Sequence, residues 1–528
     1  MASLCYGLSP IEVPAPDSRS AFRITLSLAL AVLGMGANLL MIGVDAGDRA
    51  LIDRLVDDGK MPTLARLRED GVSGGIDPLP GLADDGSWST FATAMAPGKH
   101  GRFHHEQTVP GTYFTANLAR SGMQHPPFWK ALADAGLRVG VVDVPKAPLA
   151  GLEQGIEVAD WMPHGEDTQR VTVNPVHHPL AEKFVRDPEF DCESLRVSQA
   201  ETVAHATQIR GRGLRRRELL ESLVGGEDWD FFITALAETH CAGHHFWHYH
   251  DQVHPRHDAE AAKAAGDLVA AEYREADSTL GRLIEAAGPA TNVFVFSLIG
   301  MGPNYSAAHV LDDVLRSIEG PPVRNRSELS RLKSLVPLRL KRMARRRFPG
   351  VVSSLTSPHS TRMAFVVPHD AVSGAIRLNM KGREPAGIIE AGVEYDEWCR
   401  RITDVLLAVE NADTGRPVVR EVVRVADAYP GGHAADFADL LAVWDTSQPV
   451  SSVRSAGLGA LGEPQVDRAG NHTPGGWFTM AGPGIPTQSR RINARMIDLG
   501  PTVARVLGVD LDQADGTAIA ISAATEAP

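Results

Sequence analysis

The amino-acid sequence predicts an α/β fold in which a largely parallel central sheet carries helices on both faces. From residue 38 onward, apolar runs of strand length alternate with amphipathic helical patterns, whose apolar residues recur at spacings of three and four. The predicted strands are apolar almost throughout, which is typical of parallel strands buried on both faces. Alternation of such strands with helices favours a parallel sheet between two helical layers.

The predicted elements follow in order along the chain. Gly136 closes one of the predicted helices, and Gly288-Pro289 closes the long Ala-rich one. The strands are NLLMIGVD (38–45), LRVGVVDVP (137–145), WDFFITALAE (229–238), NVFVFSLIG (292–300), ADLLAVWD (438–445) and GGWFTMAGPG (475–484). The helices are RALIDRLVDDG (49–59), PTLARLRED (62–70), PFWKALADAG (127–136), about 258–287, and ARMIDLGPTVARVLG (494–508).

Composition limits the possible functions. Of the 528 residues, 43% are hydrophobic and 22% are charged, which describes a globular protein with a large core. The net charge of −13 argues against nucleic acid as a specific partner, because phosphate neutralisation needs a basic face. The four cysteines form no CxxC pair, so they indicate neither a disulfide framework nor a thiolate zinc site.

Residues 1–36 are expected to lie outside the fold, and residues 521–528 to form a tail. The stretch FRITLSLALAVLG (22–34) has the length of a signal-peptide core and is too short for a spanning helix. Two interpretations stay open. Either Met35 is the true start and the protein is cytoplasmic, or the segment is an export signal and the protein is periplasmic or exported.

One segment is strongly basic within an acidic chain. The stretch RNRSELSRLKSLVPLRLKRMARRRFPG (324–350) lies in a predicted helical insertion at about 320–360. We expect a solvated helical surface; the alternative is that this segment contacts an anionic membrane surface or a partner protein.

Polar residues follow the predicted strands where chemistry collects in parallel sheets, beyond their carboxyl ends. These residues are Asp45, Glu238–His244 and Ser297–Gly302. The stretch AETHCAGHHFWHYH (237–250) holds five of the 20 histidines. His240 and His244 are four residues apart, so on a helix both imidazoles lie on one side, as in helices that bind zinc.

Several segments, in order, resemble the alkaline phosphatase superfamily, specifically its type I phosphodiesterase/nucleotide pyrophosphatase branch. MIGVDAGDRALIDRLVDDGKMPTLARLREDG looks like the first strand, metal Asp and following helices of that branch, and SWSTFATAMAPGKHG (87–101) resembles its W-T-S-x-x-T-G-x-x-P-x-x-H-G segment. WDFFITALAETHCAGHHFWHY, GAIRLNMKGREPAGII (374–389), GNHTPGGWFTMAGPGI (470–485) and DLGPTVARVLGVD (498–510) complete the likeness. The resemblance implies one alkaline-phosphatase-like catalytic domain over residues 37–520.

The resemblance also implies two divalent metals, usually zinc, beside a Thr or Ser nucleophile that cleaves phosphate esters through a covalent intermediate. Asp45, His244 and His472 match metal ligands of the family. Three positions depart from its pattern. The nucleophile falls on Asp84, the Asp four residues before the helical His is His240, and the paired Asp-His falls on Leu298 and Ile299.

These departures leave one firm metal site and a doubtful second one. His240, His244 and His472 offer three neutral nitrogen donors, a set suited to catalytic zinc with one open position. Asp45 is expected as a metal ligand or as a residue that orients one, and Asp84 as general base; alternatively, the two carboxylates bind a weak second ion. Direct attack by the Asp84 carboxylate and a nucleophilic Ser87 are further alternatives. Glu238 is a spare carboxylate, and the remaining histidines of 245–254 are expected to pack beside the site.

The sequence therefore predicts a metal-dependent hydrolase that acts on a small anionic phosphate ester. The alternatives are a non-catalytic relative that keeps the fold and a pocket, and an enzyme that hydrolyses sulfate esters or transfers a group. The pair Leu298 and Ile299, together with Asp84, favours the non-catalytic alternative. The exchange of one metal-binding residue type for another at His240 favours the enzyme.

Overall fold

The computed structural model describes residues 38–118, 123, 125–162, 171–175, 183–184, 198–319, 357–370, 372–455, 458–461, 468–487 and 491–521. The predicted N-terminal extension 1–36 and the basic segment 324–350 lie outside these ranges. Within them, no helix combines the length and the apolar character that crossing a bilayer requires.

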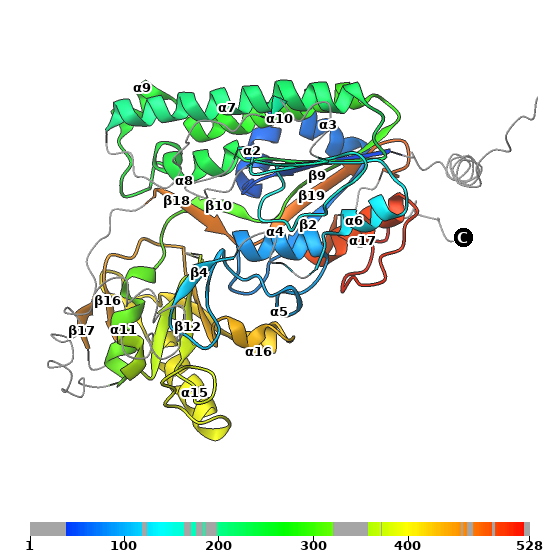
Figure 1. The fold of residues 1–528 in the computed structure, drawn as a ribbon. Coiled ribbons are helices and arrows are strands. Elements are labelled where there is room, and N and C mark those ends of the chain that lie inside the picture. Colours follow the sequence, from blue (N-terminus) through cyan, green and yellow to red (C-terminus); the bar gives the residue numbers. More distant parts are fainter. Residues whose placement is uncertain are drawn as a thin grey trace, which may run out of the picture.

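A nine-stranded sheet forms the centre of the molecule, in the order β20-β2-β19-β9-β1-β8-β5-β6-β7 (Figure 1). Its strands are β1 (Asn38–Val44), β2 (Val72–Asp77), β5 (Val139–Val142), β6 (Ile156–Ala159), β7 (Thr172–Asn174), β8 (Phe231–Leu236), β9 (Thr291–Ser297), β19 (Gly476–Ala481) and β20 (Ile492–Arg495). Strands β9, β1, β8, β5 and β6 run parallel, as do β2 and β20. The predicted α/β fold with a largely parallel sheet is confirmed.

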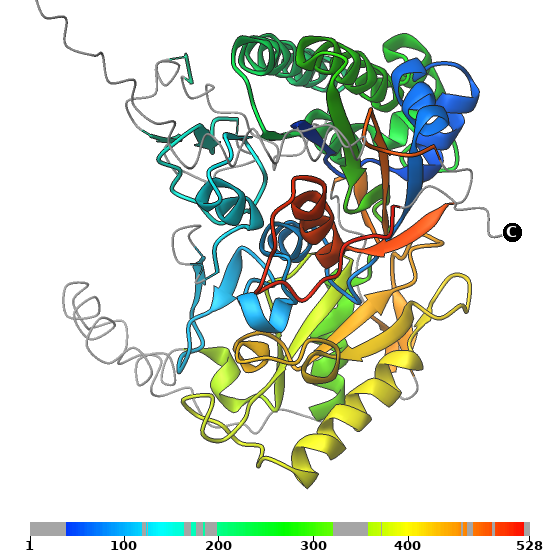
Figure 2. The same ribbon diagram turned by 90° about the vertical axis from the view of Figure 1, so that its right-hand side faces the viewer.

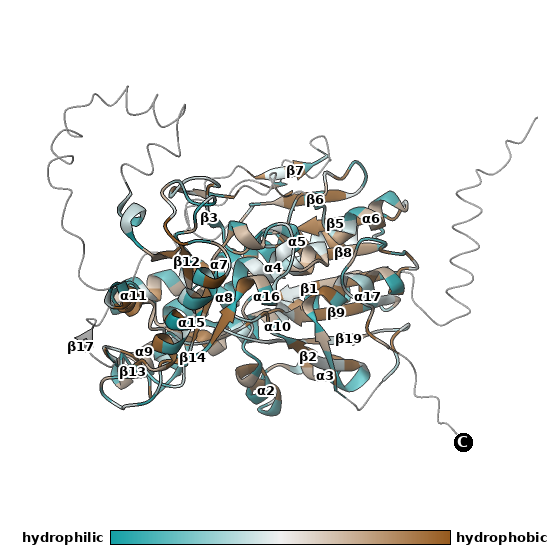
Figure 3. Ribbon diagram, turned by 90° about the horizontal axis from the view of Figure 1, so that it is seen from below, coloured by the Kyte–Doolittle hydropathy of each residue, from teal (hydrophilic) through white to brown (hydrophobic). Residues whose placement is uncertain are grey.

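Strand direction departs from this pattern at β19 and β7. Strand β19 runs antiparallel to both β2 and β9, and β7 runs antiparallel to β6. The side chains of β8 and β19 are buried throughout, and most strands of the sheet are coloured as hydrophobic in Figure 3. Burial on both faces explains why their sequences are apolar without alternation.

Helices cover both faces of this sheet (Figure 1). One face carries α2 (Arg49–Asp57), α3 (Pro62–Asp70), α7 (Gln199–Gly226), α8 (Glu238–His250) and α10 (Leu268–Ala287); the other carries α4 (Asp84–Thr93), α6 (Phe128–Asp134) and α17 (Leu499–Val506). The prediction of a single helix at about 258–287 is wrong, because the segment forms two helices. It is divided into α9 (Ala259–Ala265) and α10, because Gly266 adopts a φ of 77° and Asp267 caps a new helix by accepting from the Ala270 amide.

A second, four-stranded antiparallel sheet lies beside the first, in the order β11-β12-β15-β14. It comprises β11 (Ala364–Val367), β12 (Ser373–Leu378), β15 (Leu440–Trp444) and β14 (Val419–Arg424). Helices α11 (Leu311–Glu319) and α15 (Val393–Leu407) enclose a separate hydrophobic core with it, and α15 is the yellow helix at the edge of Figure 2. The predicted strand 438–445 belongs to this sheet.

The remaining elements are short. They are β3 (Glu106–Thr108), β4 (Thr115–Asn117), α5 (Pro97–His100), β10 (Gly300–Pro303), β13 (Glu410–Asn411), α16 (Val425–Ala428), β16 (Val453–Ser455), β17 (Leu458–Leu461) and β18 (Gly470–Thr473). The hairpin of β10 and β18 matters for the site, because it packs against α8.

Helix α8 approaches this hairpin closely. A Cβ atom on Gly470 would lie 2.1 Å from the Gly243 carbonyl oxygen, and one on Gly243 would lie 2.4 Å from Met301 Cγ. Carbon atoms cannot approach a backbone oxygen to that distance without displacing it. The missing side chain of Gly470 therefore allows α8 to approach β18, and that of Gly243 makes room for Met301 of β10.

We expect Gly470→Ala to destabilise the protein by about 1–3 kcal/mol, because the added methyl group overpacks a contact with backbone that cannot yield locally. The measurement is the free energy of unfolding from urea denaturation. Gly226→Ala is the matched control, because a Cβ there meets nothing within 4 Å. Equal unfolding free energies for the two variants would contradict this account of the α8–β18 contact.

Candidate metal centre

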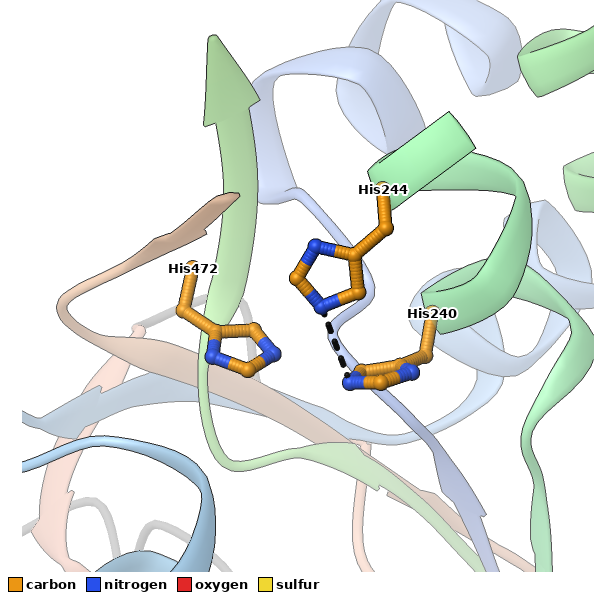
Figure 4. Close-up of side chains that lie close together, drawn as sticks. All are labelled: His240, His244 and His472. Atoms are coloured by element: carbon orange, nitrogen blue, oxygen red, sulfur yellow. Dashed lines mark hydrogen bonds between the residues drawn. The ribbon is translucent and has the colours of Figure 1, made fainter. Parts of the chain in front are cut away.

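Three histidines from distant parts of the chain meet at the carboxyl end of the central sheet (Figure 4). Helix α8 begins two residues after β8 and carries His240 and His244 in its first two turns, while His472 lies on β18. One ring nitrogen of each residue lies within 4.8 Å of the others, and all three side chains are buried. The structure thus brings together all three histidines that the sequence singles out.

The spacing of these nitrogens suits a tetrahedral ion. His240 Nε2 and His244 Nε2 are 3.2 Å apart, and the structure has a hydrogen bond between the two rings (Figure 4). Zinc–nitrogen bonds of about 2.0–2.1 Å place two ligands of a tetrahedral ion about 3.3 Å from one another. Neutral imidazoles are also preferred ligands of zinc. Both the distance and the donor type fit zinc.

The orientation of His244 favours metal binding as well. Its Nδ1 lies 2.8 Å from the Gly470 carbonyl oxygen. Since a carbonyl only accepts hydrogen bonds, the Nδ1–H donates, and a neutral ring then keeps its lone pair on Nε2, the atom that faces His240. Metal-binding histidines are characteristically oriented by such a bond from the other nitrogen.

Asp45 lies buried directly after β1. The Trp88 indole N–H donates to Asp45 Oδ1 at 3.0 Å, and the Thr239 hydroxyl donates to the Asp45 carbonyl at 2.7 Å. The second bond ties the residue before His240 to the end of β1, which positions the first turn of α8. Among the described residues, Asp45 is not one of those whose ligand atoms cluster with the three imidazoles.

Leu298 and Ile299, at the positions of the family's Asp-His pair, belong to the main hydrophobic core, each with 1% of its surface exposed. The turn that carries them is held by Ser297, whose hydroxyl donates to the Ile299 carbonyl at 2.8 Å and accepts from the Gly47 amide at 2.9 Å. The backbone of the turn is therefore well defined, while its side chains supply no ligand.

Glu238, the predicted spare carboxylate, is committed to an ion pair. Arg216 donates to Glu238 Oε1 through Nε at 3.1 Å and to Asp143 Oδ2 through Nη1, also at 3.1 Å. The guanidinium side chain is 2% exposed. A buried cation between two carboxylates fixes the start of α8 against α7, two residues before His240.

Other histidines of this region make hydrogen bonds and ion pairs outside the cluster, as His250 does with Asp267 at 2.7 Å. His254 Nε2 lies 3.2 Å from the Ala469 carbonyl, next to β18. Burial lowers the pKa of His248 to about 4, so its ring is neutral at physiological pH. His100 accepts from the Arg102 amide through Nδ1 at 3.1 Å and contacts the Thr90 hydroxyl at 3.0 Å, which stabilises the turn after α5.

The predicted catalytic residues lie at the start of α4. Asp84 is its first residue and is half-buried, whereas Ser87 is fully buried, and within the described residues its hydroxyl has no hydrogen-bond partner. A pocket of about 110 Å³ reaches from His472 and Pro474 to residues 78–82, the segment that leads into α4. This pocket extends from His472 to the segment that precedes Asp84. A larger hollow, of about 540 Å³, lies at the opposite end of the strands, around Arg138 and Trp229.

A second group of ionisable side chains was not predicted from the sequence. The buried Asp85 Oδ2 accepts from the His105 amide at 2.8 Å and from its Nδ1 at 2.9 Å, and His104 lies against both. Burial raises the pKa of Asp85, but Lys146 and the hydrogen bond from His105 hold it well below its ordinary value. The only sequence signal was the adjacent His104-His105 pair after the PGKHG turn.

Asp370, in the turn before β12, completes this group. Burial and the nearby Asp85 and Asp84 carboxylates raise its pKa well above the ordinary value. Its neighbour His369 donates through Nε2 to the Gly81 carbonyl at 2.7 Å, as does the Ser373 hydroxyl at 2.7 Å. The second sheet therefore holds the segment before α4 in place.

Comparison with curated proteins finds no match. Among solved structures, the chain is similar to human ectonucleotide pyrophosphatase/phosphodiesterase 5, with 13% identity, coverage of 91% of this chain and 97% of that one, and a TM-score of 0.48. It is also similar to phosphonoacetate hydrolase from Sinorhizobium meliloti in complex with phosphonoformate, with 15% identity, coverage of 90% and 96%, and a TM-score of 0.45.

A family model described as type I phosphodiesterase/nucleotide pyrophosphatase matches residues 39–472. The match extends over most of the chain and includes Asp45, Asp84 and all three clustered histidines. It confirms the predicted family and agrees with the predicted enzyme class, a phosphoric ester hydrolase. The chain belongs to the type I phosphodiesterase/nucleotide pyrophosphatase family.

Proposed function

We propose that this protein hydrolyses small phosphate esters with the aid of one zinc ion held by His240, His244 and His472. The observation that supports this most is the convergence of three buried imidazoles, with two Nε2 atoms 3.2 Å apart. A buried cluster of neutral rings has no stability advantage over apolar packing, whereas it is well suited to a cation.

A zinc ion held by these residues would supply a Lewis acid for a phosphoryl oxygen and would lower the pKa of water at the site. The three ligands carry no charge, so they leave the full charge of the ion available to an anionic ester. The hydrogen bond to the Gly470 carbonyl keeps His244 in the tautomer whose lone pair lies on Nε2, the nitrogen that would bind the ion. Leu298 and Ile299, at positions where the resemblance implies ligands of a second ion, are buried and supply none.

Asp84 is the residue we assign as general base. It is half-buried at the first position of α4, so it is accessible, and it lies two residues beyond Leu82 of the pocket that reaches His472. The alternative nucleophile Ser87 is fully buried in the same helix, so it would reach a substrate only if α4 moved. Accessibility therefore favours Asp84.

A non-catalytic binding protein is the second candidate. The observation in its favour is that Leu298 and Ile299, at positions where the resemblance implies two metal ligands, are packed in the hydrophobic core. The two candidates differ in whether ester hydrolysis depends on Asp84 and on the three histidines.

We expect His244→Ala and His472→Ala each to lose one equivalent of tightly bound zinc per chain, because two imidazoles do not complete a structural or catalytic zinc site. Elemental analysis of the purified proteins measures this. His250→Ala, on the same helix but outside the cluster, serves as the control and should keep the wild-type zinc content. If both cluster variants also kept it, the assigned ligand set would be wrong.

Asp84→Asn should lower kcat/KM for bis-p-nitrophenyl phosphate by about 10²–10⁴-fold while leaving the zinc content unchanged, because the amide cannot accept a proton. Ser87→Ala should retain the wild-type rate. Parallel assays of p-nitrophenyl phosphate and p-nitrophenyl sulfate identify the class of ester. An unchanged rate for Asp84→Asn would remove this residue from the mechanism, and no hydrolysis of any ester by zinc-loaded wild-type protein would favour the binding protein.

A further inference from the structure

A second buried set of potential metal ligands lies on segments other than those that carry the three histidines. We call Asp85, His104, His105 and Asp370 the Asp85 cluster. Asp85 is the second residue of α4, the two histidines follow α5, and Asp370 comes from the turn between β11 and β12. None of these positions carries a metal ligand in the resemblance to the family described above.

The donor atoms of the Asp85 cluster are close enough to share one ion. One ligand atom each from Asp85, His104 and His105 lies within 4.8 Å of the other two. His104 Nε2 is 4.0 Å from Asp370 Oδ1, too far for a hydrogen bond and compatible with an atom between them. Two buried polar groups at this distance leave room for a bridging atom between them.

Two carboxylate oxygens of the cluster lack hydrogen bonds. Within the described residues, Asp85 Oδ1 and Asp370 Oδ2 are buried and have no hydrogen-bond partner. The two side chains are only 1% and 10% exposed. A buried carboxylate oxygen without a partner carries a desolvation penalty of about 1–3 kcal/mol or more. Both side chains therefore point to a ligand that accepts electron pairs.

The two neighbouring cations do not satisfy these oxygens. Arg102 Nη2 is 3.6 Å and Lys146 Nζ is 3.7 Å from Asp85 Oδ1, so both are ion pairs that are longer than hydrogen bonds. Within the described residues, Asp85 Oδ1 therefore lies between two cations without accepting a hydrogen bond from either.

We propose that the Asp85 cluster binds a second divalent cation, at a place distinct from the one where Leu298 and Ile299 replace two ligands that the resemblance implies. A set of two imidazoles and two carboxylates suits zinc, manganese(II) or iron(II) and is unsuited to a monovalent ion. The His105 side chain is 45% exposed, so it gives the ion a route in from solvent. The existence of this site does not rest on the proposed function, but any role in catalysis would act through the adjacent Asp84.

The test counts zinc ions in protein that has been equilibrated with zinc chloride alone and then freed of unbound metal by gel filtration. Wild-type protein should hold two ions per chain, His472→Ala one, His105→Ala one, and the double variant none. His105→Ala is chosen because the side chain is half-exposed, so its removal disturbs the core least. His359→Gln, a half-buried histidine outside both clusters, should keep two ions.

Thermal melting gives a second readout that is independent of activity. Zinc should raise the melting temperature of His472→Ala, because an ion that binds only the folded state stabilises it, and should leave the double variant unchanged. Asp370→Asn combined with His472→Ala should likewise abolish the shift in melting temperature. This second pair of substitutions tests the cluster if the His105→Ala protein folds poorly.

The two assignments fail differently. Loss of an ion only in the His105→Ala and Asp370→Asn proteins would refute the three-histidine site and keep the Asp85 cluster. Loss only in the His472→Ala protein, with wild-type zinc content after substitution of His105 and Asp370, would show that the cluster is an ion-pair network without metal and would overturn the proposal.

Discussion

The close approach of α8 to β18 is the constraint on which the site depends. Gly243 and Gly470 face one another with no room for a Cβ atom on Gly470. This contact brings His472 on β18 next to the His240 and His244 side chains on α8, and it lets His244 donate to the Gly470 carbonyl. A larger separation would lose both the third nitrogen and the bond that selects the tautomer.

The charges of the ligands explain how this centre differs from a paired-metal site. In the resemblance to the family, a carboxylate occupies the position of His240, and an Asp-His pair occupies the positions of Leu298 and Ile299. Exchanging the first for an imidazole removes a negative charge from the site. Exchanging the pair for core residues takes away two of the ligands that the resemblance implies for a second ion. An ion with three neutral ligands keeps its whole charge, so a single ion attracts an anionic ester more strongly than one already neutralised by carboxylates.

The sequence predicts the parts that depend on local pattern. Apolar runs indicate the parallel strands, and the spacing of four between His240 and His244 indicates one face of a helix. Hydropathy does not indicate strand direction, so the antiparallel direction of β19 could not be predicted from it. Nor does it show that Gly266 would divide a helix, since a single glycine costs only about 1 kcal/mol there. The Asp85 cluster joins Asp370 to residues more than 260 positions away, and only the tertiary fold brings them together.

The first turn of α4 connects the two groups of ligands. Asp84 and Asp85 are consecutive, so their side chains leave the helix about 100° apart and enter different surroundings. Asp84 is half-buried, and Asp85 is buried among His105, Arg102 and Lys146. A cation bound by Asp85 would therefore place a metal ligand and the assigned general base at consecutive positions of α4, where each side chain has its own surroundings.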